Sequence, residues 1–405
     1  MHKSIILPTV HSFVNIVSVL ATTVLAQGAK QTYIIGLQKG TVLSKAIEAL
    51  LKLVQGVAAP GPAQQWSAGD LIGFTAELAP GQVRILQSNP SVLYIEPDGQ
   101  VKVQGGLSRF SKRTLQTQSP GTWGLGRVSH RAKSINPYIY DSTAGQNTCV
   151  YIIDSGVNTA HVEFGNRATS ISNWVSAESI GDLSGHGTAV AGVVGSTTYG
   201  VAKLSNLYSM KVCDQNGNCA VSNVVAAIAA TINDSPNRPC SKGVVINLSL
   251  GGLNAGWSSV NQAVVSATNA SILVVSAAGN DGADAAKYLP ASAPGSCTVG
   301  ATDVNDVKPS WSNWGSKLAV FAPGQNVQST YIGSTTATAY FDGTSMAAPH
   351  VAGLGAYLNS LNGKTNPLTM CTNIKNTATM NALTGLTGGG QSGNPNKLAY
   401  NGNGA

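Results

Sequence analysis

Charged residues are scarce in this sequence, and its first 148 positions contain no cysteine. Asp, Glu, Lys and Arg make up 10% of the 405 residues and apolar residues make up 43%, which excludes a charge-rich disordered chain. No Lys/Arg run with interleaved aromatic residues follows residue 113, so nothing indicates a nucleic-acid binder. No Cys-x-x-Cys pair or zinc-spaced Cys/His group occurs. The length suits two or three domains.

The net charge of +7 is concentrated near the N-terminus. Residues 1–113 contain ten Lys/Arg and five Asp/Glu, whereas residues 114–405 contain fourteen and twelve. The second part is therefore nearly balanced in charge if the first part is removed.

The first 26 residues have the pattern of a secretory signal peptide. Lys3 provides a basic head, and an apolar stretch runs to Ala26. A membrane anchor is the alternative, but Asn15 and several Ser and Thr residues interrupt the stretch, and no second hydrophobic segment follows. We expect cleavage near Ala26 and a secreted, extracellular protein with no remaining membrane attachment.

A small α+β unit is predicted at residues 31–103. Its alternating and helical apolar patterns follow the order strand–helix–strand–helix–strand, which is typical of a ferredoxin-like domain. The expected strands are 31–37, 71–78 and 92–103, and the expected helices are 44–55 and 81–90.

A polar linker that contains the dibasic pair Lys112–Arg113 follows this unit. An exposed linker with such a pair favours proteolytic removal, although an ordinary solvated basic patch is the alternative interpretation. We therefore predict that residues 27–113 are removed as a propeptide and that residues 114–405 form the catalytic domain.

From Trp123 onward, short Val- and Ile-rich runs alternate with helical patterns. Continuous apolar strands predict a parallel sheet that is buried on both faces, which makes the fold class α/β with a doubly wound, mostly parallel sheet. The expected strands are 149–154, 206–212, 244–250 and 272–278, and the expected helices are 188–196, 221–234 and 259–270.

Three polar residues stand at the ends of these elements: Asp154 after a strand, His186 before a helix, and Ser345 in Gly-Thr-Ser-Met-Ala before another helix. Each one alone has an ordinary explanation, as a turn residue, a hydrogen-bonded structural imidazole or a helix N-cap. Together they could meet above the carboxyl ends of the strands. Their order along the chain is that of one of the known Asp–His–Ser triads.

These residues lie in the motifs IIDSG, SGHGTAVAG, VVINLSLGG, VVSAAGN and GTSMAAPHVAG, and WGLGRVSHR starts the expected catalytic domain. In this respect the sequence resembles the subtilisin-like serine peptidases, most closely their fungal proteinase K-like branch. The resemblance covers about residues 31–400. It implies a monomeric serine endopeptidase that acts on protein or peptide substrates, and a propeptide that inhibits the cleft until it is cut away.

The resemblance also assigns roles. Ser345 is the expected nucleophile, His186 its general base and Asp154 the group that orients His186. Asn280 would complete the oxyanion hole with Ser345; the alternative is that it is an ordinary turn residue at the end of a strand. Because Gly and Ala line the expected pocket and no acidic residue does, we expect broad cleavage after apolar or aromatic residues. The expected substrate-binding residues are Ser249, Leu250, Gly251, Gly252, Ala277, Ala278 and Gly279.

Six cysteines in an exported chain suggest disulfides, with buried free thiols as the alternative. By resemblance, Cys149 pairs with Cys240, and Cys297 with Cys371. Cys213 and Cys219 bracket the turn sequence DQNGN beside the expected cleft. A third disulfide between them is a hypothesis.

No cofactor or metal is expected. In proteinase K-like enzymes a calcium site uses an Asp in a Gly-Ser-x-x-Asp stretch. Here Ala319 stands at that position and Lys317 adds a positive charge nearby. Arg131 falls at a ligand position of a second, weaker site.

Two other functions are compatible with parts of the pattern. A catalytically inactive secreted binding protein on the same fold is the main alternative, and the retained Asp154, His186, Ser345 and Asn280 argue against it. A lipase or esterase of the α/β-hydrolase class would need the G-x-S-x-G elbow and the order Ser–Asp–His, both of which are missing.

Overall fold

The computed structural model describes residues 30–55, 64–103, 106–111, 121–133, 137–387 and 392–402. The expected signal peptide and the pair Lys112–Arg113 lie outside these residues. The chain divides into two compact units, Met1–Asp98 and Gly99–Ala405. Each unit is described by itself below.

The first unit is a four-stranded antiparallel sheet with two helices, and its strand order β2-β3-β1-β4 is that of a ferredoxin-like domain. Ile35, Leu50, Phe74 and Leu86 belong to its apolar core. The sequence patterns predicted both helices and missed the short strand β2. The elements are β1 (Gln31–Leu37), α2 (Leu43–Gln55), β2 (Gln65–Ala68), β3 (Leu71–Leu78), α3 (Pro80–Gln87) and β4 (Val92–Pro97).

The predicted single strand 92–103 is wrong, because the structure divides it into β4 and β5 (Gln100–Val103), which belong to different sheets. Pro97 is the last residue of β4, an edge strand of this sheet where a missing N–H is tolerated, and the Asp98 N–H makes one further bond to the Thr32 carbonyl oxygen at 2.9 Å. A side chain at Gly99 would overlap the Trp257 ring, with a Cβ only 2.2 Å from the nearest ring atom. The chain therefore leaves the first sheet at Asp98 and enters a second sheet two residues later.

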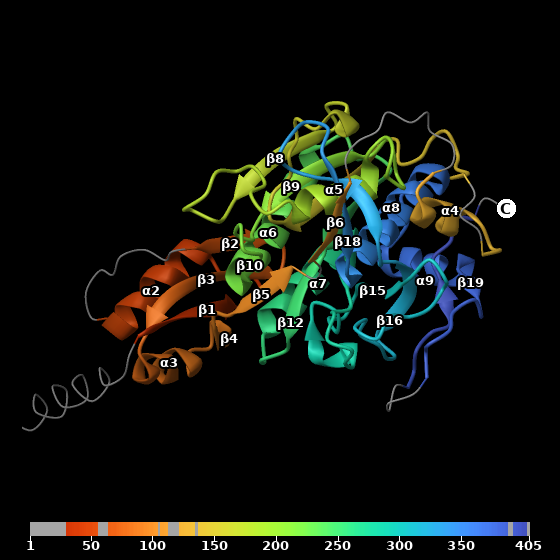
Figure 1. The fold of residues 1–405 in the computed structure, drawn as a ribbon. Coiled ribbons are helices and arrows are strands. Elements are labelled where there is room, and N and C mark those ends of the chain that lie inside the picture. The colour runs from red at the N-terminus through yellow and green to blue at the C-terminus, as the bar shows by residue number, and fades with distance from the viewer. Residues whose placement is uncertain are drawn as a thin grey trace, which may run out of the picture. The chain divides into compact units, whose positions relative to one another are not determined.

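The second unit is built on a nine-stranded sheet with the order β19-β20-β16-β15-β13-β11-β7-β9-β8 (Figure 1). All neighbouring strands are parallel except β19 and β20, which confirms the predicted mostly parallel α/β fold. The strands are β7 (Thr148–Asp154), β8 (Ala168–Asn173), β9 (Asn206–Lys211), β11 (Gly243–Leu248), β13 (Ile272–Ala277), β15 (Ser296–Thr302), β16 (Leu318–Pro323), β19 (Thr379–Met380) and β20 (Lys397–Leu398).

Two smaller sheets complete the strands of this unit. One has the order β10-β5-β12-β14 and the other β17-β18-β6. Their remaining members are β6 (Gly106–Ser111), β10 (Asn218–Ala220), β12 (Leu250–Leu253), β14 (Tyr288–Leu289), β17 (Val327–Thr330) and β18 (Thr338–Asp342).

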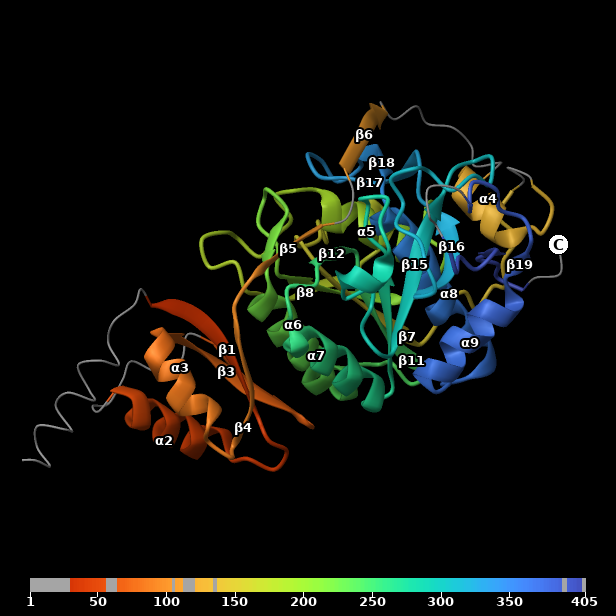
Figure 2. The ribbon, with the colours of Figure 1, turned by 90° about the horizontal axis from the view of Figure 1, so that it is seen from below.

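Helices cover both faces of the large sheet (Figure 2). α5 packs against α8 on one side, and α6 packs against α7 on the other. α8 is buried through almost its whole length, as expected for a helix without a polar face. The helices are α4 (Trp123–Ser129), α5 (His186–Gly195), α6 (Val221–Asp234), α7 (Ser258–Asn269), α8 (Thr344–Asn362) and α9 (Pro367–Thr377).

The predicted α6 matches the structure residue for residue, and α5 and α7 begin within two residues of their predicted starts. Among the described residues, no helix is both long and apolar enough to cross a membrane.

His350 makes the stability of this unit depend on pH. Its ring is buried in α8, its Nδ1 lies 2.8 Å from the Met346 carbonyl oxygen, and it packs against Gly124 of α4. Burial lowers the pKa of His350 to about 4. The unfolded chain therefore takes up a proton near pH 6.5, whereas the folded chain does so only near pH 4.

We expect the free energy of unfolding to fall by about 3 kcal/mol from this group alone as the pH drops from 6.5 to 4. The His350→Gln variant should lose that part of the pH dependence, as measured by denaturant unfolding of the inhibited protein across this range. An unchanged slope in the variant would contradict the assignment.

Candidate functional site

Asp154 ends β7 and is fully buried. Its Oδ1 accepts a hydrogen bond from the Ser155 N–H at 2.8 Å and lies 2.8 Å from His186 Nδ1. Its main-chain carbonyl accepts from the N–H groups of Val212 and Cys213 at 2.8 and 3.2 Å. The residue is therefore fixed at both its side chain and its backbone.

His186 is the first residue of α5, and close packing of glycine brings it to Asp154. A Cβ on Gly187 would lie 2.1 Å from the Gly156 carbonyl oxygen and 3.2 Å from Asp154 Oδ1. Any larger residue would push the start of α5 away from the end of β7. With Nδ1 facing the carboxylate, Nε2 faces away from it, and no group of the described residues hydrogen-bonds to that nitrogen.

Asp182 is a polar residue of this site that sequence reasoning missed. Its two carboxylate oxygens accept hydrogen bonds from the Ser155 hydroxyl, from the N–H groups of Ser184, Gly185 and Thr188, and from the Thr188 hydroxyl. Burial raises the pKa of Asp182, and these donors act against that rise. The carboxylate joins the residue after Asp154 to the first turn of α5, and so holds the Asp–His pair in register.

Ser345 lies in the first turn of α8 and is fully buried. The Ser249 hydroxyl donates to the Ser345 carbonyl oxygen at 2.8 Å, and the Asn247 amide donates to Ser249 Oγ at 2.8 Å. Met346, the next residue, packs in one apolar cluster with Ala189 of α5, so the two helix starts are neighbours. Ser345 Oγ has no hydrogen-bond partner in the part of the chain that the structure describes.

Of the two side-chain hydrogen bonds expected in the triad, the structure contains one. The Asp154–His186 bond is present, whereas His186 Nε2 and Ser345 Oγ are both buried and unpaired. Catalytic hydrogen bonds often form fully only when substrate binds, so the unpaired state of both atoms is compatible with a proton transfer between them. The role of each residue stays a prediction.

Asn280 follows β13 and is tied to the start of α8 through Thr344. Its Oδ1 accepts from the Thr344 N–H at 2.9 Å and from the Thr344 hydroxyl at 2.8 Å. The Gly279 N–H in turn donates to Thr344 Oγ1 at 3.1 Å. With Oδ1 engaged, the amide nitrogen of Asn280 is the end that is left to meet a ligand.

The expected pocket residues come from two neighbouring stretches, Ser249 to Gly252 in and before β12, and Ala277 to Gly279 at and after the end of β13. A Cβ on Gly279 would lie 2.2 Å from Asn313 Nδ2, and one on Gly251 would lie 2.8 Å from the Leu289 carbonyl oxygen. Larger residues are therefore excluded from these two walls.

A segment of the chain itself lies between two strands beside these walls. β5 pairs antiparallel with β10 on one side and with β12 on the other. Val103 is opposite Leu250, and Lys102 is opposite both Gly251 and Asn218. The two edges therefore accept an extended peptide through main-chain pairing.

Three disulfides are present, Cys149–Cys240, Cys213–Cys219 and Cys297–Cys371. They include the two pairs that the resemblance implied and the third pair that was a hypothesis. No free cysteine remains in the described part of the chain.

Ala319 lies in β16 with 6% exposure and packs in the main apolar core. Arg131 donates to the carbonyl oxygens of Thr377 and Ala378, both at 3.3 Å, and its guanidinium lies over the Tyr400 ring. Both features are compatible with the expected loss of the calcium sites, which stays a prediction.

A family model described as the subtilase family matches residues 145–402. The chain belongs to the subtilase family. It is a serine endopeptidase of the proteinase K-like branch.

This subtilase is 44% identical to a cuticle-degrading protease of Metarhizium anisopliae over 331 residues, which are 82% of this chain and 80% of the relative. It is 40% identical to proteinase R of Parengyodontium album over 370 residues, 91% and 88% of the two chains. A solved structure of a cold adapted subtilisin-like serine proteinase superimposes with a TM-score of 0.63 at 34% identity. That match covers 70% of this chain and 98% of the other.

We expect Thr344, which the sequence motifs did not single out, to position Asn280, and its removal gives a test. Thr344→Val deletes the hydroxyl that donates to Asn280 Oδ1, so we expect kcat to fall about tenfold with little change in KM, in line with the loss of one hydrogen bond. Thr344→Ser keeps the hydroxyl and should restore kcat. Equal kcat in the valine and serine variants would contradict this role.

Proposed function

We propose that this subtilase is a secreted enzyme that hydrolyses peptide bonds in proteins through an acyl-enzyme on Ser345. The observation that carries the proposal is the 2.8 Å bond between Asp154 Oδ1 and His186 Nδ1, beside a buried and unpaired Ser345 hydroxyl. The neighbouring starts of α5 and α8 support a meeting of the imidazole and the hydroxyl.

In the proposed mechanism, the Nδ1–H of His186 donates to Asp154, which leaves the Nε2 lone pair free to take the proton of Ser345. The serine oxygen forms a bond to the scissile carbonyl carbon, and the carbonyl oxygen becomes an oxyanion. When the intermediate collapses, the amine leaves with the proton held on Nε2. Water, deprotonated by the same nitrogen, then releases the acyl group from Ser345.

The oxyanion would be stabilised by the side-chain amide of Asn280 and by the N–H of Ser345 at the N-terminus of α8. Thr344 supports this role of Asn280 because it holds the amide oxygen and leaves the NH₂ group as the donor. The helix dipole adds a favourable potential for negative charge.

The specificity that we propose is broad, with apolar or aromatic residues before the scissile bond. Leu250, Ala277 and Ala278 are apolar, and close packing restricts Gly251 and Gly279 to glycine. No acidic residue in these two stretches could select Lys or Arg. Main-chain pairing with β10 and β12 would hold the substrate irrespective of its side chains.

We infer further that residues 27–113 act as an inhibitory propeptide of this monomeric enzyme. The support is the pairing of β5, which lies within that range, with the two edges expected to bind substrate. A peptide held there excludes a second one. The relative named as a cuticle-degrading protease gives a precedent for cuticle proteins as substrates, and nutritional proteins fit the same chemistry.

A fluorophosphonate probe tests the proposal against an inactive binding protein of the same fold. We expect the secreted wild-type protein to be labelled at Ser345, and the Ser345→Ala and His186→Ala variants to remain unlabelled. Labelling can be mapped by peptide mass spectrometry. An unlabelled but folded wild-type protein would favour the binding protein.

Turnover gives the second test. In subtilisin, where these effects were measured, loss of the nucleophile or base lowers kcat by about 10⁶ and loss of one oxyanion donor by about 10²–10³. We expect Ser345→Ala to lower kcat by about 10⁶ and Asn280→Ala to lower it by about 10²–10³, as measured with a chromogenic peptide. An Asn280→Ala variant with wild-type kcat would remove Asn280 from the mechanism.

A further inference from the structure

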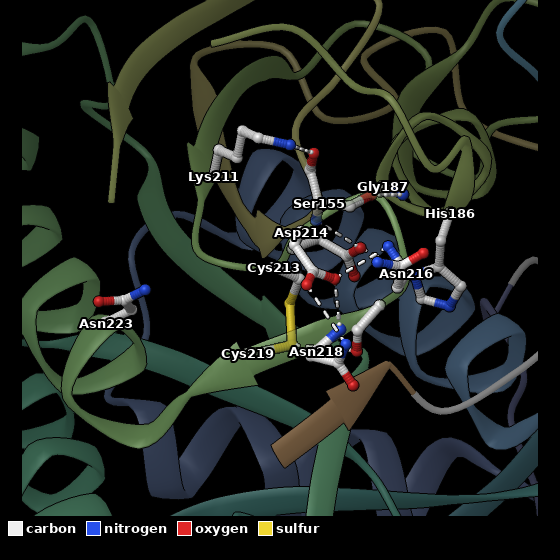
Figure 3. Close-up of a disulfide and its surroundings, with 12 residues drawn as sticks. Ser155, His186, Gly187, Lys211, Cys213, Asp214, Asn216, Asn218, Cys219 and Asn223 are labelled. Atoms are coloured by element: carbon white, nitrogen blue, oxygen red, sulfur yellow. Dashed lines mark hydrogen bonds and ion pairs between the residues drawn. A yellow bond between two sulfur atoms is a disulfide. The ribbon is translucent and has the colours of Figure 1, made fainter. Parts of the chain in front are cut away.

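The Cys213–Cys219 disulfide closes a hairpin at the edge of the substrate site (Figure 3). The two cysteines face each other as an antiparallel bridge, and both are fully buried. Between them, Asp214 Oδ1 accepts from the N–H groups of Asn216 and Asn218, both at 2.9 Å. The turn thus has a covalent closure at its base and hydrogen bonds inside its loop.

One side of this hairpin is tied to Asp154, the residue proposed to orient His186. The N–H groups of Val212 and Cys213 donate to the Asp154 carbonyl oxygen, and β9 pairs with β7 directly before them. The first cysteine therefore belongs to the rigid end of the large sheet.

The other side of the hairpin is β10, which contains Cys219 and pairs with β5, the segment Gln100–Val103. Cys219 is opposite Val101, with Asn218 opposite Lys102 and Ala220 opposite Gln100. In the described sheets, β10 is an edge strand with β5 as its one strand partner. When β5 is absent, the position of β10 depends on α6 at one end and, at the other, on the disulfide and the hydrogen bonds between Asp214 and Asn218.

The direction of β5 indicates which part of a bound substrate would pair with β10. β5 runs from Gln100 to Val103, and Val103 is opposite Leu250. The preceding residue, Ser249, contacts Ser345 through its hydroxyl. The paired residues therefore lie on the amino-terminal side of the bond that would reach Ser345.

We propose that the Cys213–Cys219 disulfide fixes β10 for strand addition. It thereby sets how much the substrate residues that precede the scissile bond increase kcat/KM. This inference rests on the proposed function. A mobile β10 would become ordered only when substrate binds, and the accompanying loss of conformational entropy would weaken substrate binding. A covalent link to the rigid end of β9 removes this loss in advance.

The experiment compares two substrates with the same leaving group, succinyl-Ala-Ala-Ala-Phe p-nitroanilide and succinyl-Phe p-nitroanilide. The full chain is expressed, and active sites of the mature enzyme are counted with the fluorophosphonate probe, so that inactive protein does not enter kcat/KM. In the Cys213→Ser/Cys219→Ser variant we expect the long-to-short ratio of kcat/KM to fall about tenfold, the equivalent of one or two lost hydrogen bonds.

Cys149→Ser/Cys240→Ser is the matched control. It removes a disulfide near the amino end of β7, at the far end of that strand from Asp154, and should leave the ratio unchanged while it lowers the stability. An unchanged ratio in the Cys213/Cys219 variant, or an equal fall in the control, would overturn the inference.

Asp214→Ala keeps the experiment decisive if the double variant is not secreted. It removes the side-chain hydrogen bonds inside the turn and retains the main-chain bonds and the disulfide, so the ratio should stay within about twofold of wild type. A tenfold fall would show that the turn, not the covalent link, holds β10. Failure of the proposed function would look different, because the wild-type enzyme would then take up no probe and cleave neither substrate.

Discussion

Two sets of bonds at Asp154 connect the parts of this site. The side chain faces the His186 ring, and the main-chain carbonyl accepts from the two residues that lead toward the edge strand β10. The same residue therefore fixes the position of the imidazole and the start of the segment that leads to β10, the proposed substrate edge. A shift of the end of β7 would move both together, which would keep the spacing between a bound peptide and the proposed base constant.

This arrangement needs groups that the large sheet alone does not provide. The Asp182 carboxylate receives five hydrogen bonds and joins the end of β7 to the start of α5. Thr344 does the equivalent for Asn280 and α8. The site is thus assembled from helix starts and strand ends, each held by a buried polar residue outside the proposed triad.

The fold of the second unit could be predicted well, because its strands are continuous apolar runs and its helices have clear periods. α6, at Val221–Asp234, was predicted to the residue. The strand predicted at 92–103 failed because apolar alternation continues through Pro97 and Gly99, where the backbone changes sheets. Asp182 and Thr344 could not be found from local pattern, since their role depends on partners that the fold brings from other elements. The triad candidates were found because their motifs are specific, whereas the unpaired state of Ser345 required coordinates.

If substrate binds between β10 and β12 as proposed, this position also determines the form in which a protein can be attacked. A chain that enters it must present free N–H and C=O groups over about four residues, as the segment Gln100–Val103 does. In a helix or inside a sheet, the N–H and C=O groups already form hydrogen bonds within the target protein. Folded targets would therefore be cut first at exposed loops or after local opening, and the rigidity of a target's backbone would protect it more than its amino-acid composition.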